Sequence, residues 1–403
     1  MATDYDVVVI GAGINGVGVA EALAAAGYKT LVVEKSGVGT QTSSRSSKLI
    51  HGGLRYLESG QFGLVRKALK ARATLLHLAP ELVKPTPFVI PVYPHSQRQA
   101  GTLRLGLGLY ALLSGFDPLG RFQQLAIPDL AKDGLNCDGV SHALQYWDAS
   151  TDDQVLTVAV MESALRCGAE LLCPATLTAL QQVDGGYRID CDLLSADKVV
   201  QQQSLTCAAV VNCAGPWVNE VISLVTPNSK QVSVEWVQGA HIILDHPAPS
   251  QVYYLESPTD HRVVFVMPWQ GQTMVGTTET VFQTLPEEIR PTAQEICYLE
   301  MLYRHYFPNN QAKTVASFAG LRVLPKLDSD AFSRPRDTLL FTDPQHPDLL
   351  SVYGGKLTTY RDTASRVLNW SCRRLGARES VADYPSLPLY PPVNAVASPA
   401  AKR

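Results

Sequence analysis

The first 34 residues constrain the fold of this 403-residue chain more than any other segment. Residues 5–10 (YDVVVI) and 29–34 (KTLVVE) are β-branched, apolar runs, which are typical of buried parallel strands. The Ala-rich residues 14–26 between them predict a helix. Together these segments form a complete β-α-β unit, which indicates an α/β fold with a parallel sheet.

A glycine-rich turn, GAGING, lies between the first strand and the helix. Gly11 permits the tight turn, Gly13 lets backbone amides approach a pyrophosphate, and Gly16 lets the helix lie close to the strand. Glu34 ends the second strand 23 residues after Gly11, where its carboxylate can accept hydrogen bonds from a ribose hydroxyl. The unit therefore predicts a dinucleotide site, and both NAD and FAD fit it.

Two features favour FAD over NAD. The Gly-, Ser- and Thr-rich residues 36–48 directly follow the acidic strand end, and they form a loop that can hold a ligand. The chain has no second G-x-G-x-x-G that would bind a separate nicotinamide nucleotide. A further apolar strand at 208–213 ends in a turn at Gly215, which can return to the cofactor.

The rest of the chain predicts two interleaved domains. Residues 231–285 contain several short alternating strands, which are typical of a mixed or antiparallel sheet. Five prolines between residues 80 and 94 predict a rigid extended crossing out of the first domain. We assign an FAD-binding domain to 1–75, 148–228 and 337–377, and an α+β substrate domain to 76–147 and 229–336. Residues 378–403 are rich in proline and predict a disordered tail.

Positive charge is concentrated locally, although the net charge of the chain is −3. This balance argues against a nucleic-acid partner, so any anion site must be built from a few cations. Arg55 in HGGLRY, Arg322 in AGLR and Lys356 in GGKLTTY each follow glycine-containing backbone and predict a phosphate site. The cations of the helix predicted at 62–78 indicate instead a solvated face: Arg66, Lys67, Lys70 and Arg72.

His51 and His241 are candidates for proton transfer near neutral pH. No spacing of His, Cys, Asp and Glu indicates a metal site, and the eight cysteines contain no C-x-x-C pair. The most apolar stretch, residues 103–116, is too short to span a bilayer. Because arginines flank it, this stretch is either a buried helix of the substrate domain or a segment that lies in a membrane interface.

Six segments along residues 4–370 carry a specific resemblance to a known family: GAGINGVGVA, SSRSSKLIHGGLRYLE, VNCAGPWV, VFVMPW with GTTE, AGLRVL and SVYGGKLTTYR. Together they resemble the FAD-dependent, quinone-linked glycerol-3-phosphate dehydrogenases. The resemblance implies a Rossmann-like FAD-binding domain of the glutathione-reductase and D-amino-acid-oxidase type. It also implies non-covalent FAD, oxidation of sn-glycerol 3-phosphate to dihydroxyacetone phosphate by hydride transfer from C2, and a quinone as electron acceptor.

The resemblance implies roles for individual residues. The expected substrate pocket comprises Arg55, Tyr56, His241, Arg322, Arg336 and Lys356, of which His241, Arg322 and Arg55 are the expected catalytic residues. The expected cofactor contacts are Gly11, Gly13, Gly16, Glu34, Lys35, Ser43, Ser44, Ser46, Ser47, Leu49, Gly215, Gly354, Gly355, Lys356, Leu357 and Thr358. In this scheme the cations hold the phosphate group and His241 is the candidate base.

The resemblance further implies a protein that is cytoplasmic and peripheral on the inner face of the cytoplasmic membrane, with a homodimer as a candidate assembly. Members of the family usually continue into a helical C-terminal domain, where this sequence has its Pro-rich segment. Three alternatives stay open: a flavin oxidase of the same fold that uses oxygen on another small substrate, an NAD-linked dehydrogenase, and a flavin-binding protein without activity.

Overall fold

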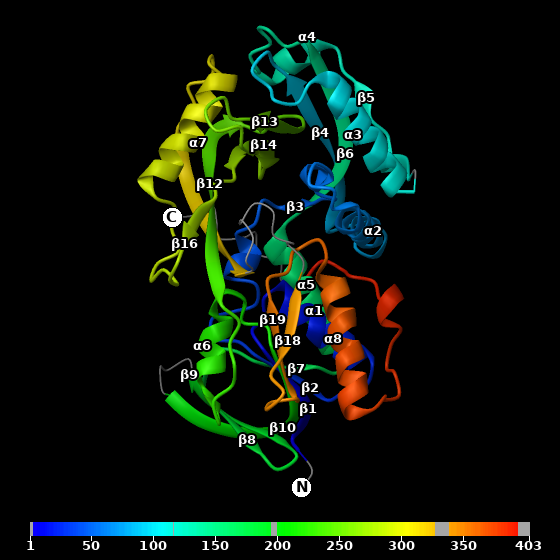
Figure 1. Ribbon diagram of the computed structural model, residues 1–403, viewed down its shortest axis with the longest axis vertical. Helices are drawn as coiled ribbons and strands as arrows, with labels where there is room; N and C mark the ends of the chain where they lie inside the picture. The colour runs from blue at the N-terminus through cyan, green and yellow to red at the C-terminus, as the bar shows by residue number, and fades with distance from the viewer. Residues whose placement is uncertain (1–2, 116, 195–199, 327–337, 394–403) are drawn as a thin grey trace.

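Two sheets, stacked along the long axis of the molecule, define two domains (Figure 1). The computed structural model describes residues 3–115, 117–194, 200–326 and 338–393. The helices in these ranges are α1 (Ile14–Ala25), α2 (Phe62–Leu78), α3 (Ala100–Leu113), α4 (Ile127–Leu130), α5 (Asp153–Arg166), α6 (Val218–Ser223), α7 (Ala293–Tyr306) and α8 (Tyr360–Leu375).

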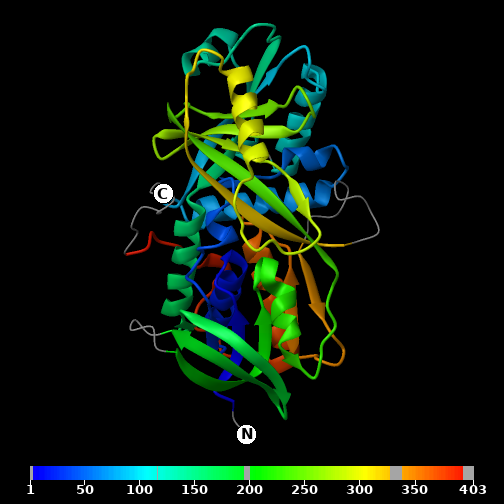
Figure 2. The same cartoon turned by 90° about the vertical axis from the view of Figure 1, so that its left-hand side faces the viewer.

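The first sheet contains the predicted β-α-β unit. Its strands are β1 (Tyr5–Ile10), β2 (Thr30–Val33), β7 (Glu170–Leu172), β8 (Ala175–Val183), β9 (Gly186–Leu194), β10 (Val200–Asn212), β11 (Val225–Thr226), β18 (Leu339–Thr342) and β19 (Leu349–Tyr353). The strand β1 pairs in parallel with β2 and β10. Figure 2 shows β8, β9 and β10 as a curved antiparallel ribbon at the end remote from the second domain.

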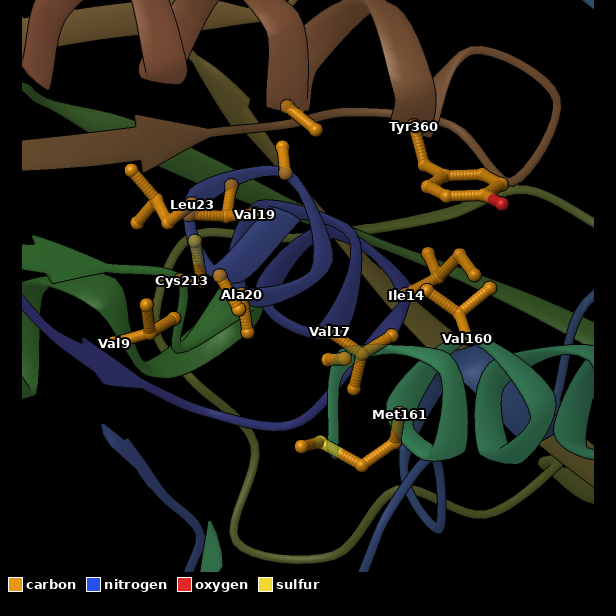
Figure 3. Packing of buried hydrophobic residues seen from close by; sticks show 14 of the residues in the cluster. Val9, Ile14, Val17, Val19, Ala20, Leu23, Val160, Met161, Cys213 and Tyr360 are labelled. Atoms are coloured by element: carbon orange, nitrogen blue, oxygen red, sulfur yellow. The ribbon is translucent and has the colours of Figure 1, made fainter. Parts of the chain in front are cut away.

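The helix α1 is buried between α5 and α8. Figure 3 shows Val17 of α1 near Met161 of α5, with Tyr360 of α8 on the other side of the same helix. Because α1 is enclosed by two helices and the sheet, its Ala- and Gly-rich sequence has almost no polar face. This enclosure holds the start of α1, and therefore the glycine turn before it, in a fixed place at the end of β1.

The second sheet is mixed, as predicted for residues 231–285. Its strands are β3 (Leu49–Ile50), β4 (Val83–Val92), β5 (Gln123–Gln124), β6 (His142–Thr151), β12 (Val234–Pro247), β13 (Val252–Glu256), β14 (Val263–Trp269), β15 (Gln272–Gly276), β16 (Thr280–Phe282) and β17 (Thr314–Pro325). The Pro-rich residues 80–94 are not only a crossing. They form β4, which pairs along its whole length with β6.

One predicted domain boundary needs correction. The sequence placed residues 49–75 in the FAD-binding domain, whereas β3 pairs with β6 of the second sheet. The helix α2 also contributes Val65 and Leu69 to a buried cluster with Phe88 of β4. The apolar residues of this face occur only at every third or fourth position of α2. The lysines and arginines between them therefore make the segment look polar in the sequence.

The apolar helix α3 combines a buried face with an exposed one. Leu103, Leu107 and Tyr110 are buried against α2 and the second sheet, whereas Leu105 and Leu112 are 77% and 55% exposed. The buried face agrees with the interpretation of this segment as a helix of the substrate domain, whereas its placement in a membrane interface stays a prediction. Among the described helices, none has the length and apolar content needed to cross a membrane.

The disorder predicted for residues 378–403 was wrong for residues 378–393. These residues run along α1 and α8, and Tyr384 and Leu389 are buried there. The amides of Val381 and Leu389 donate to the carbonyls of Ala25 and Leu78. Tyr384 also packs against the guanidinium of Arg361, which lies 4.3 Å from its ring centre. Residues 394–403 lie outside the described part of the chain.

Candidate active site

A cavity of about 1020 Å³ lies where the carboxyl ends of β1 and β2 face the second sheet. Its walls include Gly11 and Glu34 from the first sheet, and His241 and Arg322 from β12 and β17. Ligands of open α/β sheets bind at the carboxyl ends of the strands, so this is the expected place for a dinucleotide. The volume is at the upper end of the range for ligand sites.

The glycine turn has the geometry that a dinucleotide requires. Gly11 has a φ of +98°, and a Cβ on Gly16 would lie 1.9 Å from the carbonyl oxygen of Gly11. Neither position therefore tolerates a side chain. The first amide of α1, on Ile14, donates to the hydroxyl of Ser43 at 2.9 Å, which brings the loop predicted to hold the cofactor to the helix N-terminus. This arrangement suits a pyrophosphate.

Glu34 is fixed at the end of β2 by backbone amides. Its carboxylate accepts hydrogen bonds from the amides of Ala12 at 2.8 Å, Ser36 at 2.7 Å and Gly37 at 3.3 Å. A carboxylate has about four acceptor positions, so Glu34 retains capacity for a ribose hydroxyl. The cavity, the glycine turn and this acid together fit FAD.

The cavity brings together most of the predicted site residues. Those that line it are Gly11, Gly13, Glu34, Lys35, Ser43, Ser46, Ser47, Leu49, Arg55, Tyr56, Gly215, His241, Arg322, Gly354, Gly355, Lys356, Leu357 and Thr358. Gly16 and Ser44 are not part of its lining, because Gly16 lies against Gly11 and the carbonyl of Ser44 accepts from Lys48. Arg336 lies outside the described residues. No cluster of His, Cys, Asp and Glu suited to a metal occurs in the described ranges.

The cations of the cavity are held by neighbouring side chains. Arg322 donates to the carboxylate of Glu279 at 3.1 Å, and the ammonium of Lys356 lies 4.3 Å from the ring centre of Tyr56. Sequence reasoning missed Glu279, although it ends the GTTE segment that contributed to the resemblance. An acid beside Arg322 orients its guanidinium, and a planar guanidinium can bind an anion through its remaining donors.

His241 is buried and neutral. Its Nε2 and the hydroxyl of Ser47 lie 2.9 Å apart, and its ring stacks on Phe318 at 4.9 Å. Burial, with smaller contributions from Lys48 and Arg322, lowers the pKa of His241 to about 3. The imidazole is therefore unprotonated at pH 7, and so low a pKa makes it a weak proton acceptor in this environment. Burial also lowers the pKa of His51, the other histidine that the sequence singled out.

Lys48 supports the cofactor loop, although the sequence did not distinguish it from the neighbouring cations. Its backbone has a φ of 60°, which is rare for a residue other than glycine. Its ammonium is buried in an ion pair of 2.6 Å with Asp153 at the start of α5, and it lies 5.1 Å from the ring centres of Trp269 and Phe318. Lys48 thereby joins the cofactor loop to both domains.

Arg72 corrects a second expectation. The sequence predicted a solvated side chain, but Arg72 is fully buried and pairs with Asp148 at 2.7 Å and Asp117 at 2.9 Å. Its periodic position on α2 gave no sign of these carboxylates, which come from distant segments of the chain.

The fold and the cavity define an oxidoreductase that uses a dinucleotide cofactor. The chain belongs to the DAO family of FAD-dependent oxidoreductases, whose model matches residues 6–361. FAD as the cofactor and the resemblance found in the sequence are therefore confirmed.

Three curated relatives are similar over nearly the whole chain. Glycerol-3-phosphate dehydrogenases of Synechocystis and Pseudomonas aeruginosa are 34% and 36% identical over 91% of this chain, which spans 70% and 72% of their lengths. D-erythritol 1-phosphate dehydrogenase of Brucella abortus is 35% identical over 90% of this chain and 72% of its own length.

Solved structures agree on the fold. The glycerol-3-phosphate dehydrogenase of Bacillus halodurans, complexed with FAD, has a TM-score of 0.74 and 24% identity over 96% of this chain and 67% of that one. The glycine oxidase of Geobacillus kaustophilus has a TM-score of 0.70 and 20% identity over 98% of this chain and 100% of that one. The predicted fold class is confirmed.

Proposed function

We propose that this enzyme oxidises sn-glycerol 3-phosphate at C2 to dihydroxyacetone phosphate. The observation that carries the proposal is the placement of Arg55, Arg322 and Lys356 in the wall of the cavity that also contains the glycine turn. A phosphate dianion requires several cations in one place, whereas a carboxylate substrate needs only one. Names of relatives with 34–36% identity support the same substrate.

FAD, when bound, supplies the acceptor for the hydride that leaves C2. The chain provides binding and proton transfer. Arg322 and Lys356, with Arg336, bind the phosphate and so fix the distance of C2 from the reacting face. Arg55 and Tyr56 bind the rest of the substrate. His241 is the proposed acceptor of the C2 hydroxyl proton, a role that requires bound cofactor and substrate to raise its pKa from about 3 toward the working pH.

A quinone in the inner face of the cytoplasmic membrane is the proposed electron acceptor. The exposed Leu105 and Leu112 on α3, with Arg104 beside them, support contact with an anionic membrane surface. Such contact would bring the reduced cofactor near a lipid-soluble acceptor. Fourteen residues of helix can lie in the interface without crossing it.

A longer polyol phosphate is the second candidate substrate. The Brucella relative, whose name specifies D-erythritol 1-phosphate, is as similar to this chain as the glycerol-3-phosphate dehydrogenases are. Both candidates require the same phosphate site, and they differ only in the length of the chain beyond the oxidised carbon.

Anaerobic spectroscopy of the purified holoenzyme tests the proposal. Glycerol 3-phosphate should bleach the visible flavin absorbance within seconds of mixing. Plain glycerol should not bleach it. Faster bleaching by erythritol 1-phosphate would assign the longer substrate. The bleached enzyme should regain its colour rapidly with a soluble quinone and slowly with air, and rapid reoxidation by air would favour the oxidase alternative. Absence of bleaching by either phosphate would refute the proposed reaction.

A further inference from the structure

A buried hydrogen-bond network lies directly behind the substrate-binding turn HGGLRY. The amide of Gly52 donates to the hydroxyl of Tyr110 at 2.8 Å, and this hydroxyl donates to the carboxylate of Asp148 at 2.8 Å. The same amide has a longer contact, of 3.4 Å, with Oδ1 of Asp148, so the hydroxyl of Tyr110 is its shorter acceptor. Asp148 in turn pairs with Arg72 at 2.7 Å. The network therefore ties the turn to α2, which follows it in the sequence, and to the more distant α3 and β6.

The network is buried, and its polar groups are matched except for Nε of Arg72, which has no hydrogen-bond partner among the described residues. Arg72, Tyr110 and Asp148 are each no more than 1% exposed. Burial and the nearby Asp148 raise the pKa of Tyr110 well above its usual value, so its hydroxyl keeps its proton and can donate. In a buried, low-dielectric environment such bonds are strong, and they restrict the geometry of the groups that they join.

Two glycines let the turn approach this network. A Cβ on Gly52 would lie 2.3 Å from the hydroxyl oxygen of Tyr110. Gly53 has a φ of +73°, and a Cβ there would lie 2.4 Å from the ring of Tyr56. The backbone at 52–53 is thus in close contact with Tyr110 on one side and Tyr56 on the other. Arg55 follows two residues later, so the position of this turn sets where Arg55 and Tyr56 enter the cavity.

We propose that Tyr110 is a positioning residue for the substrate: its hydroxyl, held by Asp148 and Arg72, fixes the amide of Gly52 and so places Arg55 and Tyr56. The proposal rests on the proposed function, in which Arg55 and Tyr56 bind the phosphorylated polyol. Tyr110 itself acts through the turn and belongs to α3, outside the lining of the cavity.

Tyr110→Phe tests the proposal, because it removes one hydroxyl and keeps the ring. Tyr253→Phe is the matched control: Tyr253 is also fully buried in the substrate domain and donates to a carboxylate, that of Asp133, at 2.7 Å. Each variant loses a hydroxyl that donates to a carboxylate and accepts one further hydrogen bond, from the Gly52 amide in one case and from the Gln251 side chain in the other. Similar shifts in thermal midpoint are therefore expected. Only Tyr110→Phe should affect the turn.

Two measurements on the holoenzyme separate the variants. Hydrogen exchange of a peptide covering residues 50–57 should be faster in Tyr110→Phe and unchanged in Tyr253→Phe. The KM for glycerol 3-phosphate should rise about tenfold in Tyr110→Phe, within the loss expected for a small misplacement of a binding group. Its kcat should stay within about twofold, because binding groups that act equally in ground and transition states affect KM alone.

Unchanged exchange in residues 50–57, or equal changes in KM for the two variants, would overturn the proposal. A fall in kcat at constant KM would also overturn it, because that result assigns Tyr110 to the chemical step. If the wild-type flavin is not reduced by glycerol 3-phosphate, the proposed function fails. The exchange comparison still decides whether Tyr110 positions the turn.

Discussion

Replacement of Lys48 by methionine should cost about 3 kcal/mol of folding free energy, because it leaves the carboxylate of Asp153 buried without its cation. The side chains of this ion pair are 5% and 0% exposed, and their charged atoms are 2.6 Å apart. Breaking a buried pair typically costs about 3–5 kcal/mol. We expect a cost at the lower end of this range, because Asp153 keeps hydrogen bonds from the amide and hydroxyl of Ser46.

The loss of folding free energy in Lys48→Met should depend on pH. Burial raises the pKa of Asp153 even in the presence of Lys48, and removal of the ammonium raises it further. A carboxyl whose pKa is raised in the folded state contributes stability below its unfolded pKa, and this stability is lost as the pH rises. The difference in stability between wild type and Lys48→Met should therefore be larger at pH 8 than at pH 5.

Urea unfolding, followed by flavin fluorescence and circular dichroism, measures the effect. Lys67→Met is the matched control, since Lys67 forms an ion pair of the same length with Asp362 but is 24% exposed. An exposed pair contributes no more than about 1 kcal/mol. The double variant Lys48→Met with Asp153→Leu should recover at least half of the loss, because it removes the buried charge as well.

Equal losses in Lys48→Met and Lys67→Met would refute the argument from burial. So would a double variant that is less stable than Lys48→Met alone, since Asp153 would then be stabilising without its partner. A smaller loss at pH 8 than at pH 5 would show that Asp153 is not the group that responds.

Three further predictions concern the site and the surface. Arg322→Ala should lower kcat/KM for glycerol 3-phosphate at least tenfold and leave flavin content unchanged. Removal of one partner of a desolvated charge pair costs about 2–5 kcal/mol, or about 30-fold and more, and we expect a smaller minimum because Arg322 is 37% exposed. An equal loss on plain glycerol, measured in the same steady-state assay, would argue against a phosphate contact. Gly16→Ala should yield protein with little bound flavin, because its Cβ would lie 1.9 Å from a backbone oxygen; full occupancy in the visible spectrum would contradict the fit of the turn. Leu105→Glu with Leu112→Glu should abolish sedimentation with anionic liposomes but preserve activity with a soluble dye, and continued sedimentation would place membrane contact elsewhere.

The parts of the site that sequence predicts well are those encoded within a short segment. The β-α-β unit places Gly11 and Glu34 at one cavity because both lie at the carboxyl ends of neighbouring parallel strands. Arg55 and Lys356 could be found because each follows a glycine turn, and a turn without side chains lets a ligand approach closely.

What the sequence did not predict depends on partners far along the chain. In the sequence, Lys48 and Arg72 look like the other cations of residues 45–72. They differ because each is buried beside a carboxylate from a later segment, Asp153 for Lys48 and Asp148 for Arg72. Similarly, composition suggested disorder after residue 378, but Tyr384 is ordered by Arg361 of α8. Local composition indicates the structural preference of a segment in isolation, whereas burial depends on which distant segments pack against it.

The two faces of α3 have a thermodynamic consequence. One face carries Tyr110, which bonds the substrate-binding turn, and the other presents Leu105 and Leu112 to the surroundings. If Tyr110 positions the turn as proposed, any surface that binds the outer leucines and shifts this single helix would change substrate affinity. Reciprocity then requires that substrate change the affinity for the surface by the same factor. A saturated enzyme and an idle one would therefore divide differently between membrane and solution, so substrate supply itself would control how much enzyme resides at the lipid surface.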